Sequence, residues 1–198
     1  MNWRTTAVLF LILVALGGYL YYDSQQEETA VDEETIAEPT VAAPAIDQTV
    51  PLLDGAIAND VRQLDITRAE DGVVATFSHD GLGDWQQVAP TAQAVLTTTL
   101  TTQVTGFINL TSNRVFSSTE NPLSAYGLDA PAYTIGLNTL AGDGTSKAYT
   151  LSVGNETPTN NGYYVQKPGD PRVYVVAKGS VDNMINLIDN PPLPTEES

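Results

Sequence analysis

The feature that most constrains this chain is a run of eighteen residues without a charge, from Thr5 to Tyr22. As an α-helix this run would measure about 27 Å, close to the roughly 30 Å hydrocarbon core of a bilayer. Aromatic side chains stand at both of its ends, where amphipathic rings suit the lipid headgroups. The sequence therefore predicts a transmembrane helix over residues 5–22, with membrane-interface contacts from Trp3, Arg4, Tyr19, Tyr21 and Tyr22.

The orientation of this helix follows from Arg4, the positive charge that precedes it. Because positive residues favour the cytoplasmic side, residues 1–4 are predicted in the cytoplasm and everything after Asp23 outside it. The competing interpretation is a signal peptide cleaved near residues 15–17. Bulky side chains follow that triplet instead of small polar ones, which favours an anchor that stays attached to the cell membrane. A buried helix of a soluble domain is the third interpretation.

Acidic residues dominate the segment after the anchor. The whole chain has a net charge of −16, and residues 23–60 hold ten acidic residues and no basic one. Residues 61–198 are only mildly acidic, with fourteen acidic against seven basic residues. Charge of one sign and low hydrophobicity predict that 23–60 is a disordered linker. We interpret it as a spacer between membrane and domain, and an acidic docking strip for a basic partner is the alternative.

Composition limits the chemistry open to the chain. Its 198 residues include no Cys, which excludes disulfides, a lipoprotein anchor and cysteine-based metal or redox chemistry. An acidic chain is repelled by phosphates, so no nucleic-acid partner is expected. Residues 61–190 have the length of one compact domain, followed by a short tail at 191–198. We therefore expect a single extracytoplasmic domain.

Short alternating segments fill the first half of this domain. Residues 61–67 and 73–78 alternate apolar and polar side chains on either side of a turn at 70–72, which predicts a hairpin. A further strand is predicted at 85–89, before Pro90. Residues 91–104 have apolar side chains at helical spacing, although their threonines lower the helix propensity. A helix is predicted there, with a Thr-rich strand as the alternative.

The second half shows the same pattern more clearly. Alternation predicts strands at 132–140 and 148–153, joined by a glycine-rich turn, and a third strand at 163–167 after Asn161-Gly162. Residues 172–177 are apolar on both faces, which predicts a central strand. Ser180 is the predicted N-cap of a helix over 181–189.

Together these segments predict the α+β class, with a mainly antiparallel sheet and helices on one face. Each half of the domain contains a hairpin, further strand or strands, and then a helix. This order fits an internal pseudo-repeat, and coincidence is the alternative.

Motifs in the second half resemble those of a bacterial family of unknown function, numbered 4340. The segments TENPLSAYGLDAPAYTIGL, LSVGNETPTNNGYYVQ and PGDPRVYVVAKGSVDNM carry the likeness. The family's pattern is similar to Y-G-L-(D)-x-P, an alternating strand, V-G-x-x-T-P, Y-Y-V and V-Y-x-V. The matching residues are Tyr126, Gly127, Leu128, Pro131, Gly154, Thr157, Pro158, Tyr163, Tyr164, Val173 and Tyr174. The resemblance spans residues 61–190 and is strongest after residue 120.

This resemblance implies a single-pass membrane protein with an extracytoplasmic domain. Some members of the family are encoded beside transporter components of the kind linked to gliding. The family has no assigned catalytic residues, so the resemblance implies topology and fold but no activity.

Residues suited to catalysis or metal binding are few. The single histidine, His79, stands beside Asp80 without the G-x-S-x-G pattern of a nucleophile elbow, and we interpret it as a polar residue at a strand end. Asp80 and Asp84 suggest a calcium loop, but the EF-hand spacing and its closing Glu are missing, which favours a hairpin turn. The sequence thus predicts no catalytic residue, no metal site and no cofactor.

Tyrosines gather in the second half of the domain. An aromatic docking surface and ordinary sheet packing both explain them, and the candidate docking residues are Tyr126, Tyr163 and Tyr164. The favoured hypothesis is a non-catalytic, membrane-anchored domain that acts as an accessory or scaffolding subunit of a membrane protein complex. An extracytoplasmic ligand-binding module associated with a transporter is the alternative, and an enzyme is the least favoured class.

Overall fold

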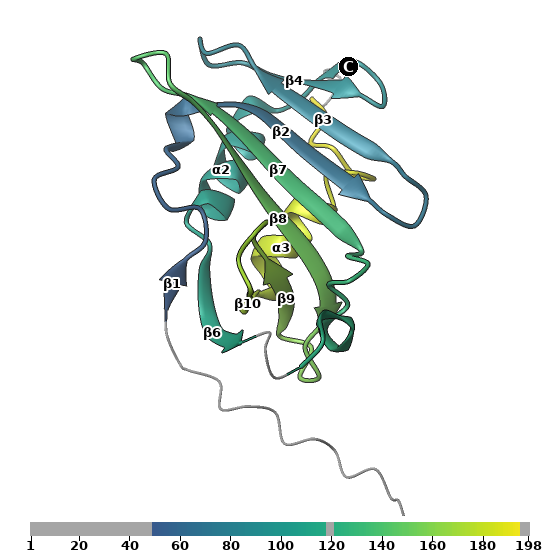
Figure 1. Cartoon of the computed structure of the whole chain (residues 1–198). Coiled ribbons are helices and arrows are strands. Elements are labelled where there is room, and N and C mark those ends of the chain that lie inside the picture. Colours follow the sequence, from purple (N-terminus) through teal and green to yellow (C-terminus); the bar gives the residue numbers. More distant parts are fainter. Residues whose placement is uncertain (1–48, 118–120, 195–198) are drawn as a thin grey trace, which may run out of the picture. The chain divides into compact units, whose positions relative to one another are not determined.

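The computed structural model describes residues 49–117 and 121–194. These residues form an open antiparallel sheet of ten strands with two α-helices (Figure 1). The predicted α+β class with a mainly antiparallel sheet is therefore confirmed. The anchor predicted at 5–22 and most of the linker predicted at 23–60 lie outside the described residues. Among those that are described, no helix has the length and apolar character needed to cross a membrane.

The elements follow one another along the chain in an order close to the predicted one. The strands are β1 (Val50–Pro51), β2 (Val61–Arg68), β3 (Val74–His79), β4 (Trp85–Ala89), β5 (Gln93–Ala94), β6 (Thr111–Ser117), β7 (Tyr133–Leu140), β8 (Ser146–Glu156), β9 (Gly162–Gln166) and β10 (Arg172–Ala177). The helices are α2 (Thr97–Ile108) and α3 (Lys178–Ile185), with 3₁₀ turns η2 (Ala58–Asp60) and η3 (Leu123–Tyr126). Across the sheet the order is β1-β6-β10-β9-β8-β7-β2-β3-β4-β5.

The β2–β7 pair joins the two halves of the chain in the middle of the sheet. Leu64 lies opposite Leu137, and Ile66 lies opposite Ile135. All four side chains are buried, because alternation places every second residue of a strand on the same face. The predicted β2–β3 and β7–β8 hairpins flank this pair and are confirmed.

The main core lies between the sheet and the two helices, which contact each other behind the sheet in Figure 1. The helices contribute the buried side chains Leu100, Val104, Phe107, Val181 and Met184. They pack in one cluster with the inward residues of β2, β3, β7 and β8. Burying each large apolar side chain contributes about 1.5–3 kcal/mol, so this cluster is the main source of the domain's stability.

A second, smaller core lies under residues 121–132, which we call the connecting segment and which lead into β7. Tyr126 and Leu128 of this segment pack on Val173, with Phe116 and Tyr164 at the edge of the cluster. Because β10 lies between β6 and β9 and carries this cluster as well as the main core, its residues are apolar on both faces. The predicted central position of residues 172–177 is confirmed.

The same connecting segment passes very close to β8. A Cβ atom at Gly154 would collide with the Tyr126 carbonyl oxygen and lie 3.0 Å from the Gly127 carbonyl carbon. Gly127 has φ 68°, a left-handed conformation that favours glycine. Both residues belong to the motifs that resemble the family, so the two motifs meet at this backbone crossing.

The first helix begins later than the sequence predicts. Residues 93–94 pair with β4 as the short strand β5, and α2 then runs from Thr97 to Ile108. A bond from the Leu96 amide to the Pro192 carbonyl holds the chain just before the helix. The Trp85 amide also donates to the hydroxyl of Thr97. The helical interpretation of the Thr-rich segment is thus confirmed from residue 97, and its start at 91 is wrong.

The second helix begins earlier than predicted. It starts at Lys178, so Ser180 lies inside it and is not its N-cap. Ala177 occupies the cap position without a side-chain hydrogen bond, because β10 leads directly into the helix. The Lys178 amide donates to the Asn161 carbonyl instead, which ties the helix start to the β8–β9 loop.

The folded domain extends beyond its predicted start at residue 61. Leu52 and Leu53 are each 3% exposed and belong to the main core. The Leu52 amide donates to the Leu110 carbonyl, and the side chains of Lys147 and Tyr149 donate to the Asp54 carbonyl. The boundary of the predicted linker is therefore corrected, since the domain includes residues from Val50 onward.

One prediction arises from α2. Gly106 is exposed in this helix, and a Cβ atom there would meet nothing within 4 Å. We expect Gly106→Ala to raise the free energy of unfolding by about 0.5–1 kcal/mol, because alanine loses less backbone entropy in a helix. Urea unfolding of the full-length protein in mild detergent, followed by tryptophan fluorescence, measures the change. A loss of stability would contradict the helical assignment at this position.

Candidate functional site

A concave pocket of about 470 Å³ lies at the meeting of β6, β9, β10 and the loop between β8 and β9. We call it the β6–β9 pocket, and its lining residues are Asn113, Arg114, Phe116, Thr157, Pro158, Thr159, Asn161, Tyr164 and Val175. It borders the smaller core, which also contains Phe116 and Tyr164. Thr157, Pro158 and Tyr164 come from the motifs that resemble the family. The pocket is therefore a concave surface to which those motifs contribute.

The loop that forms one rim of the pocket is held by its own polar groups. The Thr157 amide donates to the Gly162 carbonyl, and the Asn160 amide donates to the Thr157 carbonyl. The hydroxyls of Thr157 and Thr159 donate to Asn161 Oδ1 over 3.1 and 2.8 Å. These bonds fix the loop and orient the Asn161 amide group.

Two aromatic side chains, Phe116 and Tyr164, also line the pocket. The Tyr164 ring lies 4.9 Å from that of Tyr126 and 6.2 Å from that of Phe116, measured between centroids. Burial raises the pKa of Tyr164, nearby Tyr126 adds to the rise, and Arg114 opposes it. Tyr164 is therefore a neutral phenol at neutral pH, and its ring offers an apolar contact surface.

The charge of the pocket differs from that of the domain around it. Among the residues that the structure describes, its lining includes one cation, Arg114, and no carboxylate, although residues 61–198 hold fourteen acidic against seven basic residues. The amides of Asn113 and Asn161 add hydrogen-bond donors at the same place. The lining of the pocket therefore combines polar groups with aromatic side chains.

The three tyrosines predicted as a docking surface do not lie together. Tyr164 lines the β6–β9 pocket, and the tilted ring of Tyr126, only 6% exposed, packs against it. Tyr163 belongs to the main core on the other face of β9, because neighbouring strand residues point in opposite directions. The pocket brings in Asn113, Arg114 and Asn161, which the sequence interpretation did not single out.

Tyr163 instead takes part in a polar cluster that fastens α3 to the sheet. The Lys178 ammonium lies 2.7 Å from Glu156, 3.2 Å from Asp182 and 3.0 Å from the Tyr163 hydroxyl. Glu156 and then Tyr163 raise the pKa of Lys178, and burial raises that of Tyr163. Lys178 therefore stays protonated and acts as a structural cation, since a charged ammonium is no nucleophile.

A second polar cluster closes the turn between β9 and β10. Arg172 donates two bonds of 2.9 Å to the Asp170 carboxylate, and the Tyr174 hydroxyl donates to it over 2.6 Å. Arg172 is the main cause that holds the pKa of Asp170 far below its ordinary value. Burial, followed by Asp170, raises the pKa of Tyr174 to about 12. This cluster satisfies the hydroxyl of a tyrosine whose residue is fully buried.

The segment considered as a calcium loop is a hairpin turn between β3 and β4. Asp80 Oδ1 accepts bonds from the amides of Leu82, Gly83 and Asp84. The His79 ring contacts the tilted ring of Trp85 with a centroid distance of 4.9 Å and accepts a bond from the Gly81 amide. The His79 ring therefore stabilises the hairpin turn.

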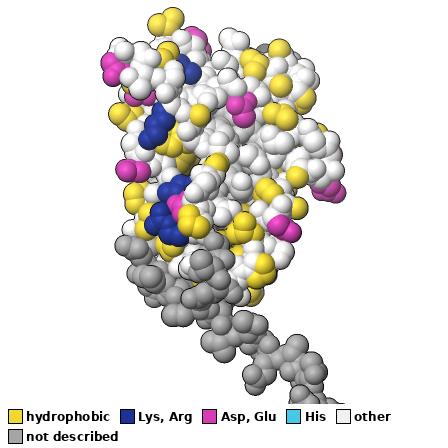
Figure 2. Space-filling model, viewed as in Figure 1, with side chains coloured by type: hydrophobic (Ala, Val, Ile, Leu, Met, Phe, Trp, Pro, Cys, Tyr) yellow, Lys and Arg dark blue, Asp and Glu magenta, His cyan; other side chains and the backbone are white. Residues whose placement is uncertain are grey.

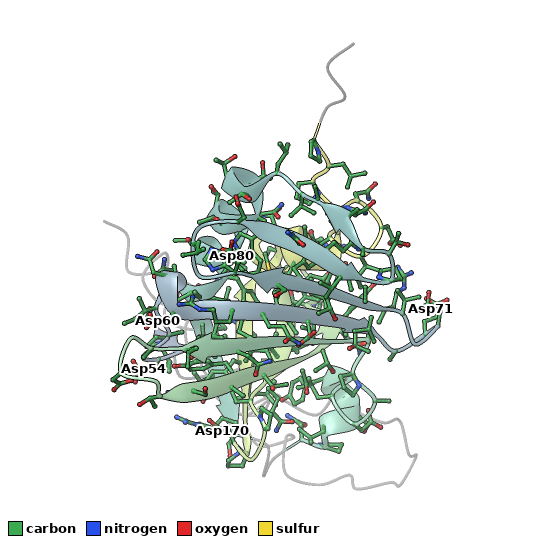
Figure 3. All side chains as sticks on the ribbon, turned by 90° about the horizontal axis from the view of Figure 1, so that it is seen from above. Asp54, Asp60, Asp71, Asp80 and Asp170 are labelled. Atoms are coloured by element: carbon green, nitrogen blue, oxygen red, sulfur yellow. The ribbon has the colours of Figure 1, made fainter. Side chains whose placement is uncertain are left out.

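Carboxylates are spread around the domain in the part of the chain that the structure describes. Asp54, Asp60, Asp71, Asp80 and Asp170 lie around its periphery in Figure 3, with Asp71 at the opposite end from the first two. Within residues 49–117 and 121–194, no three histidine or acidic side chains come together as a group that could hold a metal ion. The membrane-interface residues Trp3, Arg4, Tyr19, Tyr21 and Tyr22 lie outside those ranges, and their roles stay predictions.

Comparison with known proteins gives one result. The model of a family described as "Domain of unknown function (DUF4340)" matches residues 85–192, from β4 to the segment after α3. No curated protein and no solved structure matches the chain. The match includes the whole β6–β9 pocket.

Proposed function

The chain belongs to the DUF4340 family, and we propose that it acts as a non-catalytic accessory or scaffolding subunit of a bacterial membrane protein complex. In this proposal, residues 5–22 hold the chain in the cell membrane and the folded domain works outside the cytoplasm. The partners are other proteins of the complex, with no nucleic acid and no cofactor involved.

The observation that carries this proposal is the β6–β9 pocket. It lies on the folded domain and is lined by motif residues, and its mixture of aromatic, amide and cationic groups suits a protein partner. The polar clusters around Lys178 and Asp170 are saturated with bonds inside the domain. We therefore propose a structural role for both clusters.

The exposed surface adds a second argument. Hydrophobic side chains are scattered over the face shown in Figure 2 and form no single broad patch there. A large apolar patch is typical of a permanent interface. We therefore propose that a contact made through this face is of modest size, with the anchor raising the local concentration of the domain near its partner.

Affinity purification of the tagged full-length protein from membranes tests this proposal. In mild detergent we expect defined membrane proteins to copurify, after crosslinking in intact cells if the contact is weak. A variant with residues 49–198 deleted keeps the anchor and serves as the control for proteins retained by detergent alone. Recovery of the same proteins with both forms, or of none with either, would contradict an accessory role.

The volume of the pocket favours a second candidate function, a ligand-binding module associated with a transporter. About 470 Å³ falls within the range of small-molecule sites, and polar groups converge on it. A metabolite that raises the melting temperature of the purified full-length protein, in the absence of any partner protein, would favour this candidate over the first.

We also propose that the two halves of the domain are copies of one unit. Support comes from the strand order, in which β2-β3-β4-β5 and β7-β8-β9-β10 run outward from the central β2–β7 pair. A helix follows each set of four strands. Superposition of the two sets in an experimental structure tests the idea, and unrelated strand lengths and twists would contradict it.

A further inference from the structure

We infer that a concavity at one end of the sheet binds an isolated acidic side chain of a partner protein, together with an apolar side chain next to it. The concavity measures about 490 Å³ and lies where β2 begins, β7 ends and β8 begins. We call it the β7–β8 concavity, and its lining includes Arg62, Asn138, Leu140, Ser146, Lys147 and Ala148. The inference goes beyond the proposed accessory function, because it concerns a second surface and rests on the charges there.

The cations of this concavity are not neutralised within the described domain. Other cations form ion pairs with its carboxylates, namely Arg68, Lys167, Arg172 and Lys178. Neither Arg62 nor Lys147 forms an ion pair with a carboxylate in residues 49–117 and 121–194, and the described lining includes no carboxylate. An anionic group that enters the concavity is therefore attracted by two positive charges at once.

Neutral groups hold both cations in place. Arg62 Nη1 donates to two backbone carbonyls, of which that of Asn59 lies 2.7 Å away. The Lys147 ammonium donates to the Asp54 carbonyl over 3.2 Å and lies 4.5 Å from the centroid of the Tyr149 ring. These contacts restrict the two side chains without cancelling their charge. Nε and Nη2 of Arg62 donate no bond to a described residue, so the guanidinium keeps donors for a ligand.

The remaining lining explains the apolar part of the ligand. Leu140 is 39% exposed at the concavity, and Ala148 is exposed beside it. A carboxylate alone would leave these side chains in water, whereas an apolar side chain next to it would cover them. The Asn138 amide and the Ser146 hydroxyl add hydrogen-bond donors in the same lining. A protein segment that carries both kinds of side chain therefore fits better than a small acid.

Neighbouring carboxylates explain why the acidic side chain is an isolated one. Asp60 directly precedes β2, Asp143 lies in the β7–β8 turn, and Asp54 provides the carbonyl that binds Lys147. Asp54 and Asp60 lie at the same end of the sheet in Figure 3. These acids repel an anionic membrane surface or a run of acids such as residues 23–48, which hold eight acidic residues and no basic one. A single carboxylate between two cations is repelled far less.

Selection from a displayed library of random nonapeptides tests the inference without knowledge of the partner. The full-length protein in mild detergent is the bait. We expect enriched peptides to combine one Asp or Glu with an adjacent Leu, Ile, Val or Phe. Enrichment of basic peptides or of runs of acids, or no enrichment above beads with detergent alone, would overturn the inference.

Variants then connect the selected peptides to the β7–β8 concavity. We expect Arg62→Gln and Lys147→Gln each to weaken binding of a selected peptide about tenfold, the loss expected for one charge-assisted hydrogen bond. Arg68→Gln is the matched control, because Arg68 lies on the same strand about 20 Å from Arg62 at 3.3 Å per residue. It should change binding less than about twofold. Affinities of Arg62→Gln and Lys147→Gln equal to that of the wild type would overturn the assignment. Because Lys147 is exposed, its variant keeps the test decisive if Arg62→Gln fails to fold.

Competition distinguishes other sources of the negative charge. Full displacement of the selected peptides by millimolar inorganic phosphate would indicate a site for small anions and overturn the inference. Full displacement by a synthetic peptide of residues 23–48, at the affinity of the selected peptides, would make the chain's own acidic segment the occupant and also overturn it.

The outcomes for this inference and for the accessory function are separate. If membrane proteins copurify with the full-length protein but no acidic peptide is enriched, the accessory function stands and this inference fails. If acidic peptides bind through Arg62 and Lys147 but no membrane protein copurifies, this inference stands and the accessory function fails.

Discussion

Replacing Gly154 by alanine is expected to destabilise the domain by about 4 kcal/mol, an exceptionally large effect for the addition of a single methyl group. A Cβ at this position would collide with the Tyr126 carbonyl oxygen and press on the Gly127 backbone. Because those neighbours are backbone atoms, a change of side-chain rotamer cannot relieve the overlap. The connecting segment must lift away from β8.

The consequence reaches beyond the glycine itself. Lifting the segment would withdraw Tyr126 and Leu128 from Val173 and open the smaller core. It would also remove the support that Tyr126 gives to Tyr164 at the β6–β9 pocket. We therefore expect Gly154→Ala to lower the stability of the domain and to change the shape of the β6–β9 pocket.

Urea unfolding of the full-length protein in mild detergent measures the first effect. Gly142→Ala is the matched control, because a Cβ at Gly142 in the β7–β8 turn would meet nothing within 4 Å. It should change the free energy of unfolding by less than about 0.5 kcal/mol. Equal stabilities of the Gly154 and Gly142 variants would show that the connecting segment does not cross β8 as described.

Replacing Asp170 by asparagine is expected to destabilise the domain by about 2–3 kcal/mol at pH 7. The carboxylate accepts bonds from both Arg172 and the hydroxyl of buried Tyr174. Asparagine keeps the size of the side chain but has no negative charge. Its single amide oxygen cannot accept the two parallel bonds that a guanidinium donates to a carboxylate. The buried hydroxyl then keeps at most one weaker partner.

This effect has a defined pH dependence. The pKa of Asp170 is lowered in the folded domain from an ordinary value of 3.8, so the ionised form is bound more favourably when the chain is folded. The stabilisation is present above the ordinary pKa and is lost progressively as the pH falls below it. We expect the difference in stability between wild type and Asp170→Asn to shrink between pH 5 and pH 3.

Unfolding of both proteins by guanidinium chloride at a series of pH values measures this difference in the free energy of unfolding. Asp143→Asn is the control, because the pKa of Asp143 is also lowered but its side chain binds an amide in an exposed turn. Asp143→Asn should lower the free energy of unfolding at pH 7 much less than Asp170→Asn does. A difference between wild type and Asp170→Asn that grows as the pH falls would contradict the assigned state of Asp170.

The parts of the fold that sequence could predict are those set by neighbouring residues. The hairpins β2–β3 and β7–β8 follow from alternation on both sides of a turn, and the double-sided apolar pattern of β10 indicates its central position. The start of α2 depends on a bond between Leu96 and Pro192. No local pattern contains that contact, so the predicted helix began too early.

The candidate site was difficult to predict for the same reason. Two of its polar residues, Asn113 and Arg114, belong to β6, a strand formed by pairing with β10 far along the chain. Leu52 and Leu53 were assigned to the linker because the composition of residues 23–60 is acidic on average. Two apolar residues do not change that average, so their place in the core was missed. One sequence signal could have corrected the predicted docking surface. Tyr163 and Tyr164 are neighbours on a strand, so their side chains must point to opposite faces of the sheet and cannot form one surface.

The central claim is that a permanent anchor holds the folded domain outside the cytoplasm, and single-cysteine labelling tests it directly. The chain has no cysteine, so Leu82→Cys, at a turn residue that is 93% exposed, and Asn2→Cys each introduce one reactive thiol. In intact cells stripped of any outer layers, a membrane-impermeant maleimide is expected to label Leu82→Cys at once and Asn2→Cys only after lysis. Both should stay on a membrane-bound chain of full length. Labelling of Leu82→Cys only after lysis, or a mature chain that lacks residue 2, would contradict the account.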